Sequence, residues 1–83
     1  MRVKVVDIKD KEGYERTDDY SKQRLDEIGC IYHLEIGDCL IFKYENIFPE
    51  HQFMLTTFVE NIEENESYLT VKTKRSIYKF KKI

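Results

Sequence analysis

Residues 55–83, the last third of the chain, read LTTFVENIEENESYLTVKTKRSIYKFKKI. Three runs within this stretch, Leu55 to Ile62, Tyr68 to Thr73 and Ile77 to Phe80, are rich in β-branched and aromatic residues. Polar, turn-like breaks separate the runs, a pattern typical of a three-stranded antiparallel meander. We therefore expect the rest of the chain to pack against this meander.

The first residues of the chain also predict a strand. Residues 2–8 alternate charged and aliphatic side chains, but Val5 and Val6 are adjacent where strict alternation would turn only one of them inward. This pair predicts a β-bulge. The polar stretch 9–16 is expected to be a loop.

One short helix is expected within residues 17–28. Residues 17–19 (Thr-Asp-Asp) supply an N-cap candidate and acidic first-turn residues, and Gly29 is suited to end the helix. Its predicted apolar face holds Tyr20, Leu25 and Ile28.

Two further strands are expected between this helix and the meander. Residues 30–34 form a short apolar run, and residues 39–44 (CLIFKY) alternate so that three large side chains share one face. These are Leu40, Phe42 and Tyr44. Residues 46–52 contain the single proline, Pro49, and are expected to be an exposed connection.

The predicted fold is mainly β, a β-rich α+β domain that spans residues 1–83. Five to six short strands with one short helix, in so few residues, fit a small half-open barrel of the SH3-like or OB-like kind. Eleven aromatic residues, six Tyr and five Phe, supply enough bulk to fill a small core.

Charge is segregated along the chain, whose formal net charge is −2. Residues 1–43 carry ten acids and eight bases, residues 44–71 six acids and no Lys or Arg, and residues 72–83 six bases and no acid. The net charge favours neither nucleic acid nor a membrane as partner. No signal peptide is visible and no apolar run approaches the roughly 20 residues of a membrane span, so a cytoplasmic protein is expected.

Four side chains of metal-binding type occur, Cys30, His33, Cys39 and His51. Structural zinc sites usually present their ligands as close pairs, but eleven residues separate Cys39 from His51. In a strand, Cys30 and His33 would point to opposite faces. We therefore predict two free thiols, no metal site and no cofactor.

The sequence also holds no nucleophile elbow, no phosphate-binding loop and no HExxH pair. His33 could pair with Asp38 or Cys39 across a hairpin turn, but this names no reaction. The protein is therefore predicted not to be an enzyme.

Glu60, Glu63, Glu64 and Glu66 cluster around the first meander turn. They could steer a basic partner surface toward the turn. They could equally be a solubilising loop that is partly neutralised by basic residues on neighbouring strands. The candidate basic residues are Lys72, Lys74 and Lys79.

The basic C-terminal segment predicts single-stranded nucleic-acid binding as an alternative function, because Lys and Arg neutralise phosphates. The residues concerned are Lys72, Lys74, Arg75, Lys79 and Lys81. Tyr78 and Phe80 alternate with the lysines of the last strand, so the rings should enter the core while the cations face solvent. The same lysines could simply protect an edge strand from pairing with other chains.

The segments TTFVENI (residues 56–62) and LTVKTKRSIYKF (residues 69–80) resemble a pattern in small orphan proteins of Firmicute phages and related mobile elements. That pattern runs Thr-Ser-x-Val-x-x-Ile, then a turn, then Thr-x-Asn-Ser-x-Tyr. The resemblance implies a small β-barrel and names no activity. This chain has Phe58 where the pattern has proline and Arg75 where it has asparagine, and either departure could mark a position that faces a partner.

The predicted function is that of a non-enzymatic interaction module, which binds a host or partner protein through one face or edge of the barrel. In the phage-type context such a module would inhibit a host system. The predicted contacts cluster around the first meander turn or depart from the resembled pattern. They are Phe58, Glu60, Glu63, Glu64 and Arg75.

Overall fold

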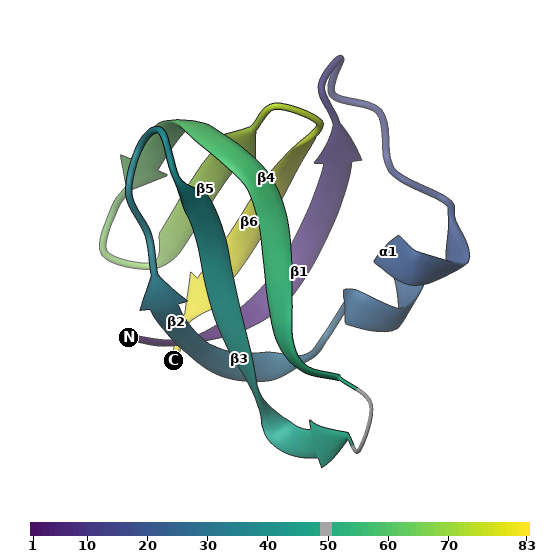
Figure 1. The fold of residues 1–83 in the computed structure, drawn as a ribbon, viewed down its shortest axis with the longest axis vertical. Helices are drawn as coiled ribbons and strands as arrows, with labels where there is room; N and C mark the ends of the chain where they lie inside the picture. Colours follow the sequence, from purple (N-terminus) through teal and green to yellow (C-terminus); the bar gives the residue numbers. More distant parts are fainter. Residues whose placement is uncertain (49–50) are drawn as a thin grey trace.

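In the computed structural model the strands join in sequence order into a closed antiparallel barrel (Figure 1). The structure describes residues 1–48 and 51–83, and it describes side chains for all residues except 47–51. The described elements are β1 (Arg2–Asp10), α1 (Asp19–Arg24), β2 (Ile28–His33), β3 (Cys39–Phe48), β4 (His51–Glu64), β5 (Tyr68–Thr73) and β6 (Ser76–Lys82). This confirms the predicted mainly β fold, with six strands and one short helix among the described residues.

β1 closes the ring, whereas the sequence predicted a half-open barrel. Its first residues pair with β2, where Val3 lies opposite Gly29, and almost its whole length pairs with β6, from Val3 opposite Lys82 to Asp10 opposite Ser76. The two ends of the chain therefore lie side by side, and the Ile83 N–H donates to the Arg2 carbonyl at 3.1 Å (Figure 1).

The predicted bulge in β1 is confirmed. Val5 lies opposite Phe80 and Asp7 lies opposite Lys79, so Val6 is the extra residue. Because of the bulge, Val5 and Ile8 both enter the core although they are three positions apart.

β1 also runs further than predicted, because residues 9–10 continue its pairing with β6 instead of starting a loop. Polar side chains do not prevent this, since the ladder is made by backbone groups.

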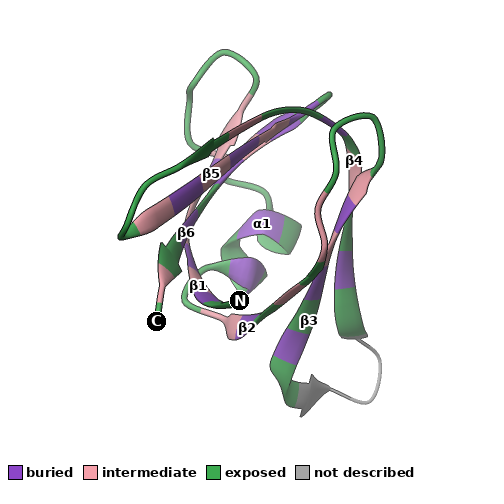
Figure 2. Ribbon diagram, turned by 90° about the vertical axis from the view of Figure 1, so that its left-hand side faces the viewer, coloured by how far each residue is buried: buried purple, intermediate pink, exposed green. Residues whose placement is uncertain are grey.

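The core is built from the inward-facing residues that alternate along the strands, as Figure 2 shows for the buried bands along the ribbon. Phe42 and Phe80 are fully buried and their rings stack with centroids 5.8 Å apart. The Tyr44 ring meets Phe42 edge-on at 5.1 Å. The predicted inward faces of β3 and β6 are therefore confirmed, and the inward face of β5 adds to them. The buried members on these strands are Leu40, Phe42, Tyr44, Leu69, Val71, Thr73, Ser76, Tyr78 and Phe80.

The helix is shorter than predicted. Asp18 is its N-cap and accepts a hydrogen bond from the Ser21 N–H, but α1 ends before Leu25, and Gly29 belongs to β2. The cause is pairing with β1: the Asp26 N–H donates to the Val5 carbonyl at 2.8 Å, with Asp26 at a φ of 68°. Leu25 is extended and Asp26 is left-handed, so neither residue continues the helix.

The predicted apolar face of the helix is wrong as well. Ser21 and Arg24 are the buried residues of α1, while Tyr20 and Leu25 are exposed. Ile28, the third predicted member, lies in β2.

The segment predicted as an exposed connection, residues 46–52, is largely strand. Asn46 lies in β3 and Gln52 in β4, and both side chains are exposed, so this hairpin extends beyond the barrel wall (Figure 1). Pro49 lies outside the described residues.

Burial of two tyrosines predicts a loss of stability at alkaline pH. Burial raises the pKa of Tyr44 from its ordinary value of 10.0 to about 12, and burial also raises the pKa of Tyr78. A raised folded-state pKa gives a stability contribution that is complete below pH 10 and is lost as pH rises toward 12. We expect the free energy of unfolding to fall over this pH range. In a pH titration followed by tyrosinate absorbance, part of the signal should appear only at the alkaline end.

Tyr44→Phe is the matched variant for this titration. It should lose less stability than the wild type over the same pH range and lack part of the late tyrosinate phase. An unchanged pH profile would show that Tyr44 does not remain protonated in the folded protein.

Candidate functional site

A patch of exposed apolar side chains covers the outer side of β2, β3 and β4, and we call it the apolar face. Its members are Tyr32, Ile36, Ile41, Phe53, Leu55 and Phe58. Ile41 lies opposite Leu55 across the β3–β4 ladder, and the Tyr32 and Phe53 rings meet edge-on at 5.8 Å. Tyr32, Leu55 and Phe58 are 69%, 60% and 63% exposed.

A bulge in β4 explains why Leu55 and Phe58 share this face. Cys39 lies opposite Phe58 while Ile41 lies opposite Leu55, so β4 has one more residue than β3 between these pairs. The Thr56 hydroxyl accepts a hydrogen bond from the Leu40 N–H at 3.0 Å and thereby stabilises the irregular backbone. The bulge shifts the inside–outside alternation and turns a second large apolar side chain outward.

A polar cluster lies at the turn between β2 and β3, beside this face. The ring atom Nε2 of His33 lies 3.0 Å from Asp38 Oδ2 and 3.9 Å from Glu35 Oε2. Of the two partners that the sequence left open for His33, the structure has Asp38. The backbone N–H of Cys39 and, next, the hydrogen bond with His33 hold the pKa of Asp38 below its ordinary value.

The candidate metal quartet is not brought together among the described side chains. Cys30 and Cys39 are free thiols, and neither belongs to the cluster of His33, Glu35 and Asp38. His51 has no described side chain, so its candidate role lies outside the described residues. An exposed cluster of two carboxylates and one imidazole is common on protein surfaces without an ion.

The acidic residues of the first meander turn have partners other than those predicted. Glu60 lies 3.4 Å from Lys11 Nζ, and Glu64 forms an ion pair with Lys82. Glu63 is exposed and forms no ion pair with a described residue. The predicted neutralisation by three lysines is therefore wrong, because none of them forms an ion pair with a described residue. These are Lys72, Lys74 and Lys79.

The basic residues grouped by sequence divide between two surfaces. Lys72, Lys79 and Lys81 lie on the outer side of β5 and β6, opposite Ile77, Thr70 and Tyr68 across the ladder, and we call this the lysine face. Lys74 and Arg75 occupy the turn between these strands. Within β6 the buried side chains of Tyr78 and Phe80 alternate with exposed Lys79 and Lys81, as predicted.

A groove runs between β4, the β5–β6 turn and α1, and we call it the turn groove. It consists of two hollows of about 310 Å³ and 240 Å³, which share Thr56, Thr57 and Arg75. Phe58 and Lys74 line the first hollow as well. Arg16, Tyr20, Ser76 and Tyr78 are among the residues that line the second. None of the described lining residues is acidic.

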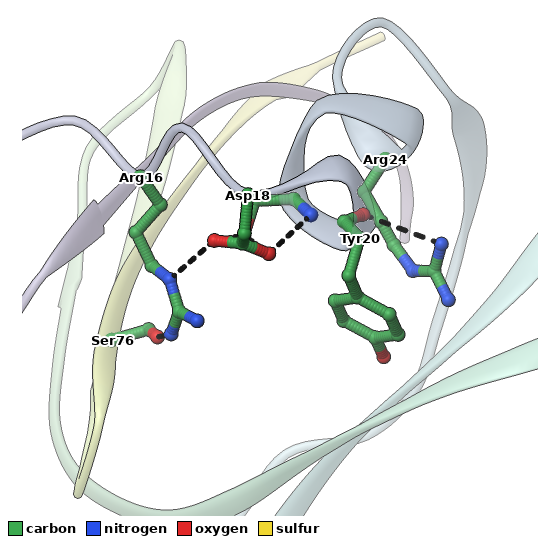
Figure 3. A network of polar contacts seen from close by, with 6 residues as sticks. Arg16, Asp18, Tyr20, Arg24 and Ser76 are labelled. Atoms are coloured by element: carbon green, nitrogen blue, oxygen red, sulfur yellow. Dashed lines mark hydrogen bonds and ion pairs between the residues drawn. The ribbon is translucent and has the colours of Figure 1, made fainter.

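A polar network fixes Arg16 at one end of this groove (Figure 3). Its Nη1 donates to Ser76 Oγ at 2.7 Å and its Nε donates to Asp18 Oδ1 at 3.0 Å. The Ser21 N–H, together with Arg16, keeps the pKa of Asp18 below its ordinary value. Arg16 is therefore held by contacts on both sides of its guanidinium.

Arg24 joins α1 to the barrel beside this network (Figure 3). Its side chain is 6% exposed, and its guanidinium lies 3.7 Å from the Tyr20 ring centroid and 5.8 Å from that of Tyr44. Among the described residues it has aromatic rings and the Tyr20 carbonyl as neighbours, and it forms no ion pair. Cation–π contact thus stabilises this buried charge.

Comparison with known proteins gave no relative: a scan against protein-family models, a search of curated proteins and a search of solved structures each returned no significant match. The resemblance to phage proteins stays a prediction. Among the described residues, no helix has the length and apolar character needed to cross a membrane.

The structure also reveals residues that the sequence did not single out. Of the predicted contacts, Phe58 and Arg75 line the same hollow. Phe58 is also a member of the apolar face. Tyr32, Phe53 and Leu55 were not identified, because apolar strand residues resemble core residues in a sequence. The one available signal was the adjacent pair Thr56–Thr57, which interrupts the apolar alternation of β4.

Proposed function

We propose that this protein is a non-enzymatic interaction module that binds a partner protein through the apolar face. The observation that carries the proposal is the exposure of Tyr32, Leu55 and Phe58 on one side of the barrel wall, where the Tyr32 ring contacts Phe53 and β4 pairs with β3. Contiguous exposed apolar patches of this kind are typical of protein–protein interfaces, and aromatic residues are frequent among the side chains that dominate binding energy.

The charges around the face specify the partner's chemistry. Glu35 and Asp38 flank Ile36 at one end, and Glu60 follows Phe58 and Val59 along β4. The complementary surface is therefore a folded protein with an apolar centre and basic residues that face these carboxylates, because opposite charges around an interface speed association and fix orientation. Lys74 and Arg75 line a hollow with Phe58 and favour acidic groups of the partner beside that residue. Glu63, Glu64 and Arg75 remain predicted contacts.

The sequence resemblance adds a biological setting to the proposal. In a phage or mobile element, the partner is a protein of the host, and the module acts in the cytoplasm as an inhibitor of a host system. The closed ring supports a face over an edge as the binding surface, because every described strand has neighbours on both sides in the barrel.

Leu55→Lys should abolish capture of the partner by an immobilised protein. Burying an added charge at the centre of an interface should lower affinity about 30-fold or more, the effect of losing a single dominant contact. The measurement is quantitative capture from host extract, followed by titration of the recovered partner.

Gln23→Lys is the control, because it adds the same charge at an exposed position of α1, away from the face. It should capture the partner as the wild type does, and thermal unfolding should show that both variants are folded. Equal capture by Leu55→Lys and the wild type would refute the apolar face as the binding surface.

A further inference from the structure

We propose that the turn groove binds single-stranded nucleic acid, with Arg75, Lys74 and Arg16 on the phosphates and Phe58 stacked on an unpaired base. This inference goes beyond the protein-binding function and does not depend on it. It refines the nucleic-acid hypothesis drawn from the sequence, because the site now includes Arg16 and Phe58, which that hypothesis did not contain.

The charge of the groove favours an anionic ligand. Three cations line the two hollows and no described lining residue is a carboxylate. Lys74 and Arg75 form no ion pair with any described residue, so their charges are available to a ligand. Arg16 is held by Ser76 at 2.7 Å and by the Asp18 carboxylate at 3.0 Å, so its remaining N–H groups are positioned for a phosphate with little loss of entropy, while Asp18 offsets part of its charge.

Positive charge continues from the groove onto the lysine face, which favours a chain of phosphates over an isolated anion. The lysine face directly adjoins the turn that carries Lys74 and Arg75, and its three lysines form no ion pair with a described residue. Residues 72–83 carry six bases and no acid, although the whole chain has a net charge of −2. A backbone with regularly spaced phosphates matches such a track.

An aromatic ring of the groove also suits a nucleotide. The Phe58 ring is 63% exposed where it lines the first hollow, and bases of any identity stack on such rings.

The size of the hollows and the need for stacking select a single strand. A base can lie flat on Phe58 only when it is unpaired, and a duplex keeps its bases stacked inside the helix. A duplex also presents its phosphates on a wide cylinder, whereas the hollows measure only about 310 Å³ and 240 Å³. Single strands should therefore bind more tightly than duplexes of equal length.

The test is fluorescence anisotropy of a short labelled oligothymidylate, titrated with the full chain over a series of salt concentrations. We expect binding at low salt, and the logarithm of the association constant should fall linearly with the logarithm of the salt concentration. Arg75→Ala should lower the slope of this line by about 0.7, the value for one lost phosphate contact with a single strand. Phe58→Ala should weaken binding roughly 5- to 150-fold with little change in slope.

Two controls accompany these variants. Lys22→Ala removes an exposed cation of α1 that forms no ion pair with a described residue, and it should bind as the wild type does. Tyr32→Lys alters the apolar face at a residue that does not line the groove and should retain oligonucleotide binding, which separates the two functions although Phe58 and Leu55 belong to both surfaces. Thermal unfolding of each variant verifies the fold.

Three outcomes would overturn the inference. The first is an absence of binding at low salt. The second is wild-type affinity in both Arg75→Ala and Phe58→Ala, which would show that the oligonucleotide touches only the lysine face. The third is displacement of the oligonucleotide by polyglutamate at equal charge concentration, which would identify the groove as a site for acidic peptides.

Discussion

Phe42→Ala is expected to lower the free energy of unfolding by about 3 to 5 kcal/mol, the range for removing a fully buried phenylalanine. Its ring lies at the centre of the core, 5.1 Å from Tyr44 and 5.8 Å from Phe80 between centroids. A domain of this length has a total stability of about 4 to 12 kcal/mol. The loss is therefore a quarter or more of the total stability, and the denaturant midpoint should fall accordingly, as measured by denaturant titration followed by circular dichroism.

Phe53→Ala is the matched control, because it removes the same side chain from the outer side of the sheet. Phe53 is 38% exposed and its ring contacts Tyr32 and not the core. We expect a loss of about 1 kcal/mol or less. Equal losses for the two variants would show that Phe42 is not the centre of the packing.

Gly29→Ala should destabilise the barrel by about 3 kcal/mol or more, the upper range for steric overpacking. A methyl group at Gly29 would lie 2.1 Å from the Lys43 carbonyl oxygen and 2.7 Å from Cζ of Phe42. The carbonyl cannot move away cheaply, because Gly29 pairs with both Val3 of β1 and Tyr44 of β3. The measurement is again the free energy of unfolding in denaturant.

Gly13→Ala separates this clash from the general effect of losing a glycine. No atom lies within 4 Å of a methyl group at Gly13, but its φ of +93° disfavours a side chain. We expect a loss of about 1 to 2 kcal/mol, from backbone strain alone. If Gly29→Ala proves as mild as Gly13→Ala, β2 and β3 can separate locally and the close approach does not constrain the fold.

These two sites show which parts of the fold a sequence can predict. Phe42 could be placed in the core because strand side chains alternate with a period of two residues, and this local regularity is written in CLIFKY. Gly29 was assigned to the end of a helix. Its actual role depends on strands that approach it from both sides, and no local pattern encodes those neighbours.

The surfaces were harder to predict for the same reason. The lysines of β6 could be placed outside because they alternate with core aromatics, but the bulge at Thr56–Thr57 decides which apolar residues of β4 face solvent. That bulge depends on register with β3, a non-local property. Ion-pair partners such as Lys11 for Glu60 were missed because they lie far away in the chain.

The closure of the ring by β1 and β6 has a consequence for synthesis on the ribosome. Of the described strands, β1 is made first and β6 last, so the edge of β1 stays unpaired while the intervening strands are translated. An unpaired edge is a template for strands of other chains. Contacts between residues so distant in sequence also form slowly. The nascent chain therefore passes through an aggregation-sensitive interval that ends only when β6 docks.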